Sequence, residues 1–178
     1  MNSKKQGGHC LCTETRFWLT PPDGVTFQSV VGSTPFAVSP EGRRLAFTSG
    51  GAGRRRQLWI RSFDSIDAQP VAGTEGAINP FWSPDGRSVG FFADNRLKRI
   101  SLSGGDVVTI CESSVGGGGT WNQGGTIVFA PGIETPLLQV SASGGTPTPA
   151  TQLDASQGDS AHIAPVFLPD GRRFLFSL

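Results

Sequence analysis

Three polar residues that lie close together in the sequence, Asp159, Ser160 and His162, are of the types that form a hydrolase triad. In such a triad the imidazole takes the serine proton and the carboxylate orients the imidazole. Neighbouring side chains of an extended segment, however, point to opposite faces and do not converge on one atom. We therefore expect His162 to be a structural or binding residue at the entrance of a strand.

Other catalytic patterns are incomplete. No Gly-x-Ser-x-Gly elbow occurs, and the motifs of a protein kinase are missing. The glycine run 116–119 resembles a phosphate loop, but no helix pattern follows to supply a dipole and an array of amides. We expect no enzymatic activity, no catalytic residues and no cofactor, so the purified chain should hydrolyse neither ATP nor peptide and ester substrates.

The cysteines and the single arginine cluster also favour ordinary structural interpretations. Cys10, Cys12 and Cys111 are odd in number, which excludes a complete disulfide framework. His9 with Cys10 and Cys12 lacks the second ligand pair of a tetrahedral zinc site, so no metal is expected. The arginines at 54–56 follow a glycine-rich stretch and are interpreted as a solvated hairpin tip.

The charge balance excludes whole classes of partner. The formal net charge is +1 at pH 7, so no global field gathers nucleic acid or anionic lipid. No apolar run is long enough for a transmembrane helix, and no apolar signal-peptide core follows Met1. We expect neither nucleic-acid binding nor a membrane segment, and the localisation stays unknown.

One short unit recurs four times, and it determines the predicted fold. The turn glycines Gly42, Gly86, Gly125 and Gly171 are 44, 39 and 46 residues apart, a spacing typical of propeller blades. Proline sets φ for the turn, aspartate bonds back to nearby amides, and glycine accepts the left-handed conformation. The residues assigned to these turns and to the strand before the third turn are Ser39, Pro40, Gly42, Ser83, Pro84, Asp85, Gly86, Trp121, Gly125, Pro169, Asp170 and Gly171.

The remaining strands are predicted from the alternation of apolar and polar residues and from the glycines and prolines that end each strand. The 25 glycines and 13 prolines indicate short strands with many turns. We predict first strands at 36–38, 78–82, 119–121 and 164–167, second strands at 45–48, 89–93, 127–130 and 174–178, and third strands at 58–63, 97–102 and 137–142. Outer strands are predicted near 69–72, 107–111 and 149–153. The large residues at Trp82, Trp121 and Phe167 should pack between units, and the third turn, one residue shorter, should have a different geometry.

This pattern gives an all-β fold, a partial β-propeller of about 3.5 four-stranded antiparallel blades. Residues 1–16 are predicted to be a disordered tail and 17–178 the propeller, with units at about 33–73, 74–112, 113–154 and 155–178. Because the sequence stops after the second strand of the fourth unit, we expect a truncated propeller, whose open edge is covered by missing blades or by a second copy.

The Ser-Pro-Asp-Gly-Arg hairpins resemble the TolB-type, WD40-like propeller repeat. The longer pattern, including Leu58-Trp59-Ile60-Arg61, Pro80 to Gly86 and Leu97 to Gly105, is similar to the propeller attached to bacterial serine/threonine protein kinases. This resemblance implies a non-catalytic interaction or sensor module, with an extracytoplasmic location in the family. Two alternatives stay open: the gating propeller of a prolyl-oligopeptidase-like serine peptidase, and a free-standing TolB-like periplasmic scaffold.

Partners of propellers meet the loops at the mouths of the central channel. Among the loops that enter first strands, Glu75, Asp159 and His162 are the polar residues that we single out for contact with a protein or small ligand. The alternative is that they only form turns and satisfy local hydrogen bonds.

Overall fold

A computed structural model describes residues 21, 26–27, 35–51, 53–114 and 116–178 of this chain. These residues form three four-stranded sheets and one two-stranded sheet, all with antiparallel pairing. Each sheet pairs its strands in chain order, as a propeller blade does. The predicted partial propeller of about 3.5 blades is therefore confirmed. The predicted tail at 1–16 lies outside the described residues.

Most strands agree closely with the sequence-based prediction, but the outer strand predicted near 149–153 is wrong: β12 covers Thr148–Pro149 only. Their bounds are β1 Phe36–Val38, β2 Arg44–Gly51, β3 Arg54–Ser62, β4 Ala68–Pro70, β5 Ile78–Trp82, β6 Ser88–Ala93, β7 Arg96–Ser101, β8 Val108–Glu112, β9 Gly119–Trp121, β10 Thr126–Phe129, β11 Leu138–Ser141, β12 Thr148–Pro149, β13 Ile163–Phe167 and β14 Phe174–Ser177. One short 3₁₀ helix, η1 Ala155–Gln157, precedes β13.

The first hairpin differs most from its prediction, because β2 and β3 pair far beyond the expected positions. Ser49 lies opposite Gln57, and Gly51 lies opposite Arg54 after a register shift. The segment expected as a loop and a solvated arginine run is therefore mostly ladder. Arg55, whose side chain is 65% exposed, bonds Asp94 of the second sheet at 2.7 Å.

The repeated turns have the chemistry that the motif predicts. In the second hairpin the Gly86 N–H donates to the Ser83 carbonyl at 2.9 Å, and the Asp85 carboxylate accepts from the Arg87 N–H at 3.0 Å. The four turn glycines all have positive φ, between 64° and 80°. Only glycine adopts this conformation without a steric penalty, which explains its recurrence.

The third hairpin differs in geometry, as expected, but keeps the turn hydrogen bond. The Asn122 N–H donates to the Thr126 carbonyl four residues on, whereas the Ser83 N–H donates to the Ser88 carbonyl five residues on. The Gly125 N–H donates to the Asn122 carbonyl at 3.1 Å. The Asn122 side-chain oxygen accepts from the Thr126 N–H at 2.9 Å, just as the Ser83 hydroxyl accepts from the Ser88 N–H at 2.8 Å in the second hairpin. An amide oxygen therefore replaces a hydroxyl at the same place.

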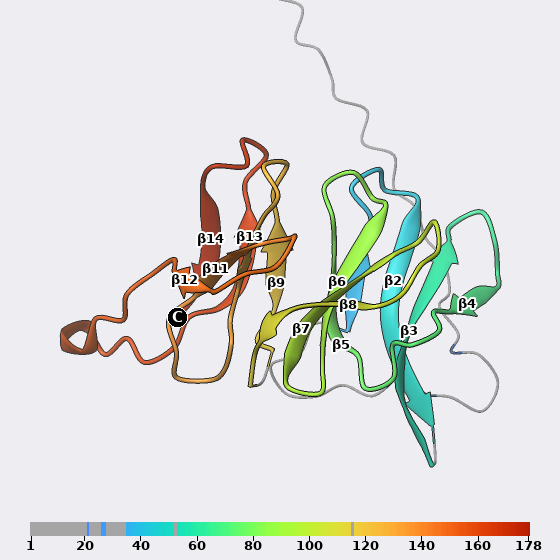
Figure 1. Cartoon of the computed structure of the whole chain (residues 1–178), viewed down its shortest axis with the longest axis horizontal. Coiled ribbons are helices and arrows are strands. Elements are labelled where there is room, and N and C mark those ends of the chain that lie inside the picture. Colours follow the sequence, from blue (N-terminus) through green and yellow to red (C-terminus); the bar gives the residue numbers. More distant parts are fainter. Residues whose placement is uncertain (1–20, 22–25, 28–34, 52, 115) are drawn as a thin grey trace, which may run out of the picture.

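The sheets follow one another across the molecule in chain order, and their inner strands β1, β5, β9 and β13 are neighbours (Figure 1). The core fills the spaces between sheets. Trp82 packs with residues of the first and second sheets, Trp121 packs against the cluster between the second and third, and Phe167 packs against Val128 and its neighbours. The predicted role of these large residues between units is confirmed.

Two glycines make room for the aromatic ring at the centre of this packing. Phe81 of β5 is 7% exposed and lies opposite Gly90 of β6. A β-carbon added to Gly90 would be 2.3 Å from the ring, and one added to Gly119 of β9 would be 2.6 Å from it. The ring therefore fits between two backbones that carry no side chain.

Cys111 is the free cysteine among the described residues. Burial, reinforced by the nearby Glu112 carboxylate, raises the pKa of its thiol to about 11. A thiol that stays protonated is a poor nucleophile and a poor metal ligand, so this residue functions as a small apolar side chain. In the described part of the chain, no helix is long and apolar enough to cross a membrane.

Candidate binding groove on the inner strands

The inner strands of all four sheets line one groove of about 580 Å³. Its walls are β1, β5, β9 and β13, each of which has a paired strand on one side only. Three apolar side chains at its surface are markedly exposed: Phe36 at 42%, Val38 at 57% and Val166 at 59%. The lining residues are Phe36, Ala37, Val38, Pro40, Pro80, Phe81, Trp82, Gly118, Gly119, Thr120, Ala164, Pro165, Val166 and Phe167.

The lining of the groove is mostly apolar. Of the described residues that line it, none carries a titratable side chain. The Thr120 hydroxyl is already used, because it accepts from the Phe167 N–H at 3.0 Å. General acid or base catalysis needs a titratable group within hydrogen-bond reach of the substrate. The lining can instead enclose an apolar segment of a ligand.

A left-handed residue recurs at the entrance of three of the inner strands, β5, β9 and β13. Asn79, Gly118 and Ala164 have φ values of 48°, 101° and 51° and occupy the same position of their units. The β5–β6 and β13–β14 pairings shift register at this point. Asn79 also donates its side-chain amide to the Gly116 carbonyl of the next unit. Of these three residues, Gly118 and Ala164 belong to the groove lining.

The structure brings Asp159 and His162 together. His162 is 2% exposed, its Nε2 lies 2.7 Å from Oδ2 of Asp159, and its Nδ1 lies 2.7 Å from the Thr151 hydroxyl. The His162 ring also packs on Phe176, with centroids 4.4 Å apart. The other carboxylate oxygen of Asp159 is buried without a hydrogen-bond partner.

The expectation that Asp159 and His162 cannot converge was wrong. It assumed an extended segment, whereas η1 is followed by the left-handed Gly158 and only Ile163 begins the strand. The third member of the network is Thr151, on the preceding loop, and not Ser160.

The hydroxyl–imidazole–carboxylate order equals that of a catalytic triad, but the repeat explains Thr151 differently. Its hydroxyl accepts from the Leu137 N–H at 2.9 Å, and Thr74 accepts from the Leu58 N–H at 3.1 Å at the same place of the first unit. Both threonines satisfy a backbone amide at the same position of their units, within β3 in the first and just before β11 in the third. His162 extends this local network.

The candidate loop residues therefore divide into two sets. Glu75 is exposed in the loop before β5, whereas Asp159 and His162 are largely enclosed by their own network. Among the described residues, no three metal-ligating side chains gather, and the stretch with His9 and Cys10 lies outside them. Sequence reasoning missed the groove itself, because its residues are apolar and come from four units. The sequence shows apolar Phe36 and Val38 at alternate positions of a first strand, but their exposure is seen only in the structure.

Comparison with solved structures identifies the architecture. TolB from Acinetobacter baumannii superposes with a TM-score of 0.66 at 17% identity over 80% of this chain. The chain has the fold of a TolB-type, WD40-like β-propeller. The propeller domain of Cps50 (Swd1) from Myceliophteria thermophila superposes with a TM-score of 0.59 at 17% identity over 82% of the chain, and a puromycin hydrolase in complex with PGG superposes with 0.59 at 18% over 79%.

A curated relative is detectable in sequence as well. The chain is 30% identical over 148 residues to the uncharacterized peptidase YuxL of Bacillus subtilis (strain 168). The matched region covers 78% of this chain. No family model matches. The chain spans 20% of YuxL, 37% of the Acinetobacter TolB, 48% of the Cps50 propeller and 24% of the puromycin hydrolase.

Proposed function

We propose that this chain is a non-catalytic propeller module that binds an apolar peptide segment of a partner protein in the groove of the inner strands. The observation that carries the proposal is a groove of about 580 Å³ with exposed apolar walls and no titratable lining among the described residues. Contiguous exposed apolar surface at a concave site is typical of recognition sites.

Peptide selection on the immobilised chain tests this proposal. Linear peptides from a random phage library should be enriched for apolar residues, and Val38→Asp or Val166→Asp should weaken their binding by about tenfold or more, about 1.4 kcal/mol. Both valines are more than half exposed, so their replacement should leave the fold intact.

Ile66→Asp is the matched control, because Ile66 is 87% exposed and does not line the groove. It should leave peptide binding unchanged. Peptides that bind the Val38→Asp and Val166→Asp variants as well as the original chain would refute the groove as the site.

A second candidate function is favoured by the similarity to YuxL and to the puromycin hydrolase. In this proposal the chain is part of the propeller that gates access to a serine peptidase domain. The kinase-linked resemblance remains a prediction and would imply a sensor on the extracytoplasmic side. Sequencing the flanking reading frames distinguishes them: a downstream Gly-x-Ser-x-Gly domain supports the peptidase, an upstream kinase domain supports the sensor, and a signal peptide without either supports a free-standing scaffold.

We also propose that the unpaired edge of β14, with the exposed leucines beside it, is a contact surface for further blades or for a second copy. Leu175 and Leu178 are 63% and 81% exposed, and β14 pairs only with β13 among the described strands. Unpaired strand edges are templates for another strand. Light scattering of the purified chain should therefore show association that increases with concentration, and Leu175→Lys should reduce it. A monodisperse monomer at all concentrations would contradict this proposal.

A further inference from the structure

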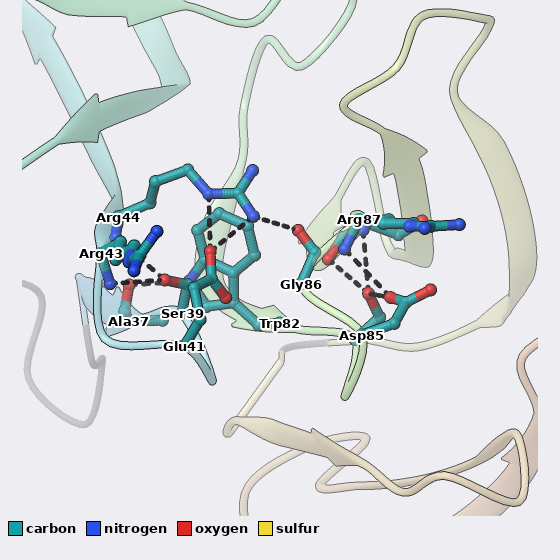
Figure 2. Close-up of polar contacts among 11 residues, drawn as sticks. Ala37, Ser39, Glu41, Arg43, Arg44, Trp82, Asp85, Gly86 and Arg87 are labelled. Carbon is teal, nitrogen blue, oxygen red and sulfur yellow. Dashed lines mark hydrogen bonds and ion pairs between the residues drawn. The ribbon is translucent and has the colours of Figure 1, made fainter.

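The first two hairpins hold a guanidinium group between them. Arg44 of the first hairpin lies over the Trp82 ring, with its central carbon 4.9 Å from the ring centroid. It donates to the Glu41 carboxylate at 2.7 and 2.8 Å and to the Gly86 carbonyl at 2.7 Å (Figure 2). The first hairpin thus supplies the acid, and the second unit supplies the aromatic ring and the carbonyl.

We call the contact between the hairpins of two successive units a seam. The second seam, between the second and third units, repeats the acid and the ring but not the arginine. Asp85 occupies the position of Glu41, and Trp121 occupies that of Trp82. Ser88 stands where Arg44 stands, and its backbone confirms the equivalence. The Ser88 N–H donates to the Ser83 hydroxyl at 2.8 Å, and the Arg44 N–H donates to the Ser39 hydroxyl at 2.9 Å. The short serine side chain cannot reach across the tryptophan.

The space that a guanidinium would occupy at this seam is open. A cavity of about 410 Å³ lies there, with Asp85, Trp121 and Gly125 among its lining residues. A β-carbon added to Gly125 would meet no atom within 4 Å, whereas one added to Gly86 would lie 2.6 Å from the Glu41 carboxylate. At the third seam Asn122 bridges directly, donating to the Gly171 carbonyl at 2.9 Å.

The groups around this cavity favour a cation. Hydrogen bonds from the Ser83 hydroxyl and the Arg87 N–H keep the pKa of Asp85 below its usual value, so its carboxylate is ionised at neutral pH. Both of these contacts use Oδ1, so neither of them occupies Oδ2, and Asp85 is one of the residues that line the cavity. Trp121 is half-buried, and tryptophan offers the most favourable ring face for a cation.

We propose that this slot, defined by Asp85, Trp121 and Gly125, binds the guanidinium of an arginine side chain on a partner protein. The planar guanidinium fits stacking and carboxylate pairing together, as Arg44 shows in the neighbouring slot. Asp85 and Gln123 are exposed, so the slot covers one side of a ligand and suits a side chain held by a larger partner. The site is separate from the inner-strand groove and independent of the function proposed for it.

Titration with N-acetyl-arginine amide tests the site, with N-acetyl-citrulline amide as the neutral isostere. The readout is the indole N–H signal of Trp121 in the ¹⁵N spectrum of the full chain. The arginine compound should give saturable shifts and the citrulline compound none. Asp85→Asn, which keeps an oxygen for the Arg87 N–H, should weaken binding by about fivefold or more. Trp121→Leu, which lacks the indole and is followed by the backbone amide signal of Gly125, should weaken it by a similar factor.

The sharpest variant is Ser88→Arg, which supplies the slot with its own guanidinium. It should abolish binding of the arginine compound and raise the melting temperature. The converse variant, Arg44→Ser, should open the first slot and add a second binding event, reported by the indole of Trp82. Arg44→Ser keeps the inference testable if Ser88→Arg does not fold.

Three outcomes would overturn the inference. The first is equal binding of the arginine and citrulline compounds, or none of either up to their solubility limits. The second is binding that persists unchanged when Ser88→Arg folds. The third concerns Arg87, the cation next to Asp85: if only Arg87→Ala binds the arginine compound, then the slot is filled by the chain itself. We expect Arg87→Ala to bind at least as well as the original chain.

Discussion

Replacing Gly90 with alanine is expected to destabilise the chain by about 1–3 kcal/mol, because overpacking of a close-packed core costs about that much. The new β-carbon would lie 2.3 Å from the Phe81 ring, and the ring cannot retreat because the Gly119 backbone closes its other side. Thermal unfolding followed by circular dichroism should show a melting temperature about 3–10 °C lower.

The ring itself provides the control for this prediction. Phe81→Leu removes the atoms that clash, so Gly90→Ala should cost much less in that background than in the original chain. The two substitutions should therefore be strongly non-additive, as expected for residues in direct contact. Additive losses would mean that Gly90 matters for strand conformation and not for the space it leaves to Phe81.

The second large effect is expected at the turn of the second hairpin. Gly86→Val should destabilise by about 2–3 kcal/mol, of which about 1–2 kcal/mol is the cost of the left-handed conformation for a residue with a β-carbon. The rest comes from the Glu41 carboxylate, which an added β-carbon would approach to 2.6 Å and therefore displace. Arg44, which donates to this carboxylate, would be displaced with it. Arg87→Ala, at an exposed position, should stay within about 0.5 kcal/mol.

Gly42→Val separates the two contributions to that loss. Gly42 has φ 69° against 68° at Gly86, but a β-carbon there would meet no atom within 4 Å. Its substitution should show the conformational cost alone in urea unfolding. Equal losses at Gly42 and Gly86 would argue against the contact between hairpins. Equal stability of Gly86→Val and Arg87→Ala would contradict the turn geometry itself.

The sequence was sufficient for the strands and turns, because each is determined by neighbours along the chain. The Pro-Asp-Gly pattern around Gly86 predicts its hairpin, and period-two alternation predicts β6. The extension of the first hairpin through Ser49 and Gln57 was not predictable in this way. Its glycine-rich segment is typical of loops, and only the pairing of β2 with β3 stabilises it as a strand.

The candidate sites were harder to predict, since they combine residues from different units. Asp159 and His162 were identified by residue type, but their meeting depends on the turn at Gly158 and on Thr151 from another loop. Arg44, Trp82 and Glu41 become one cluster only when two hairpins are placed side by side. An alignment of the four repeats shows Ser88 at the position of Arg44, but the empty space beside it is a property of packing.

The contacts between hairpins always join two different positions of the repeat. Arg44 of one unit donates to the turn carbonyl of the next, and Asn122 does the same one seam further along. The second unit accepts from the unit before it through Gly86 and donates to the unit after it through Asn79, so it meets its two neighbours through different surfaces, as in a head-to-tail contact. Any unit that extends this arrangement, whether from the same polypeptide or another, would dock head to tail and continue the rotation toward a closed ring.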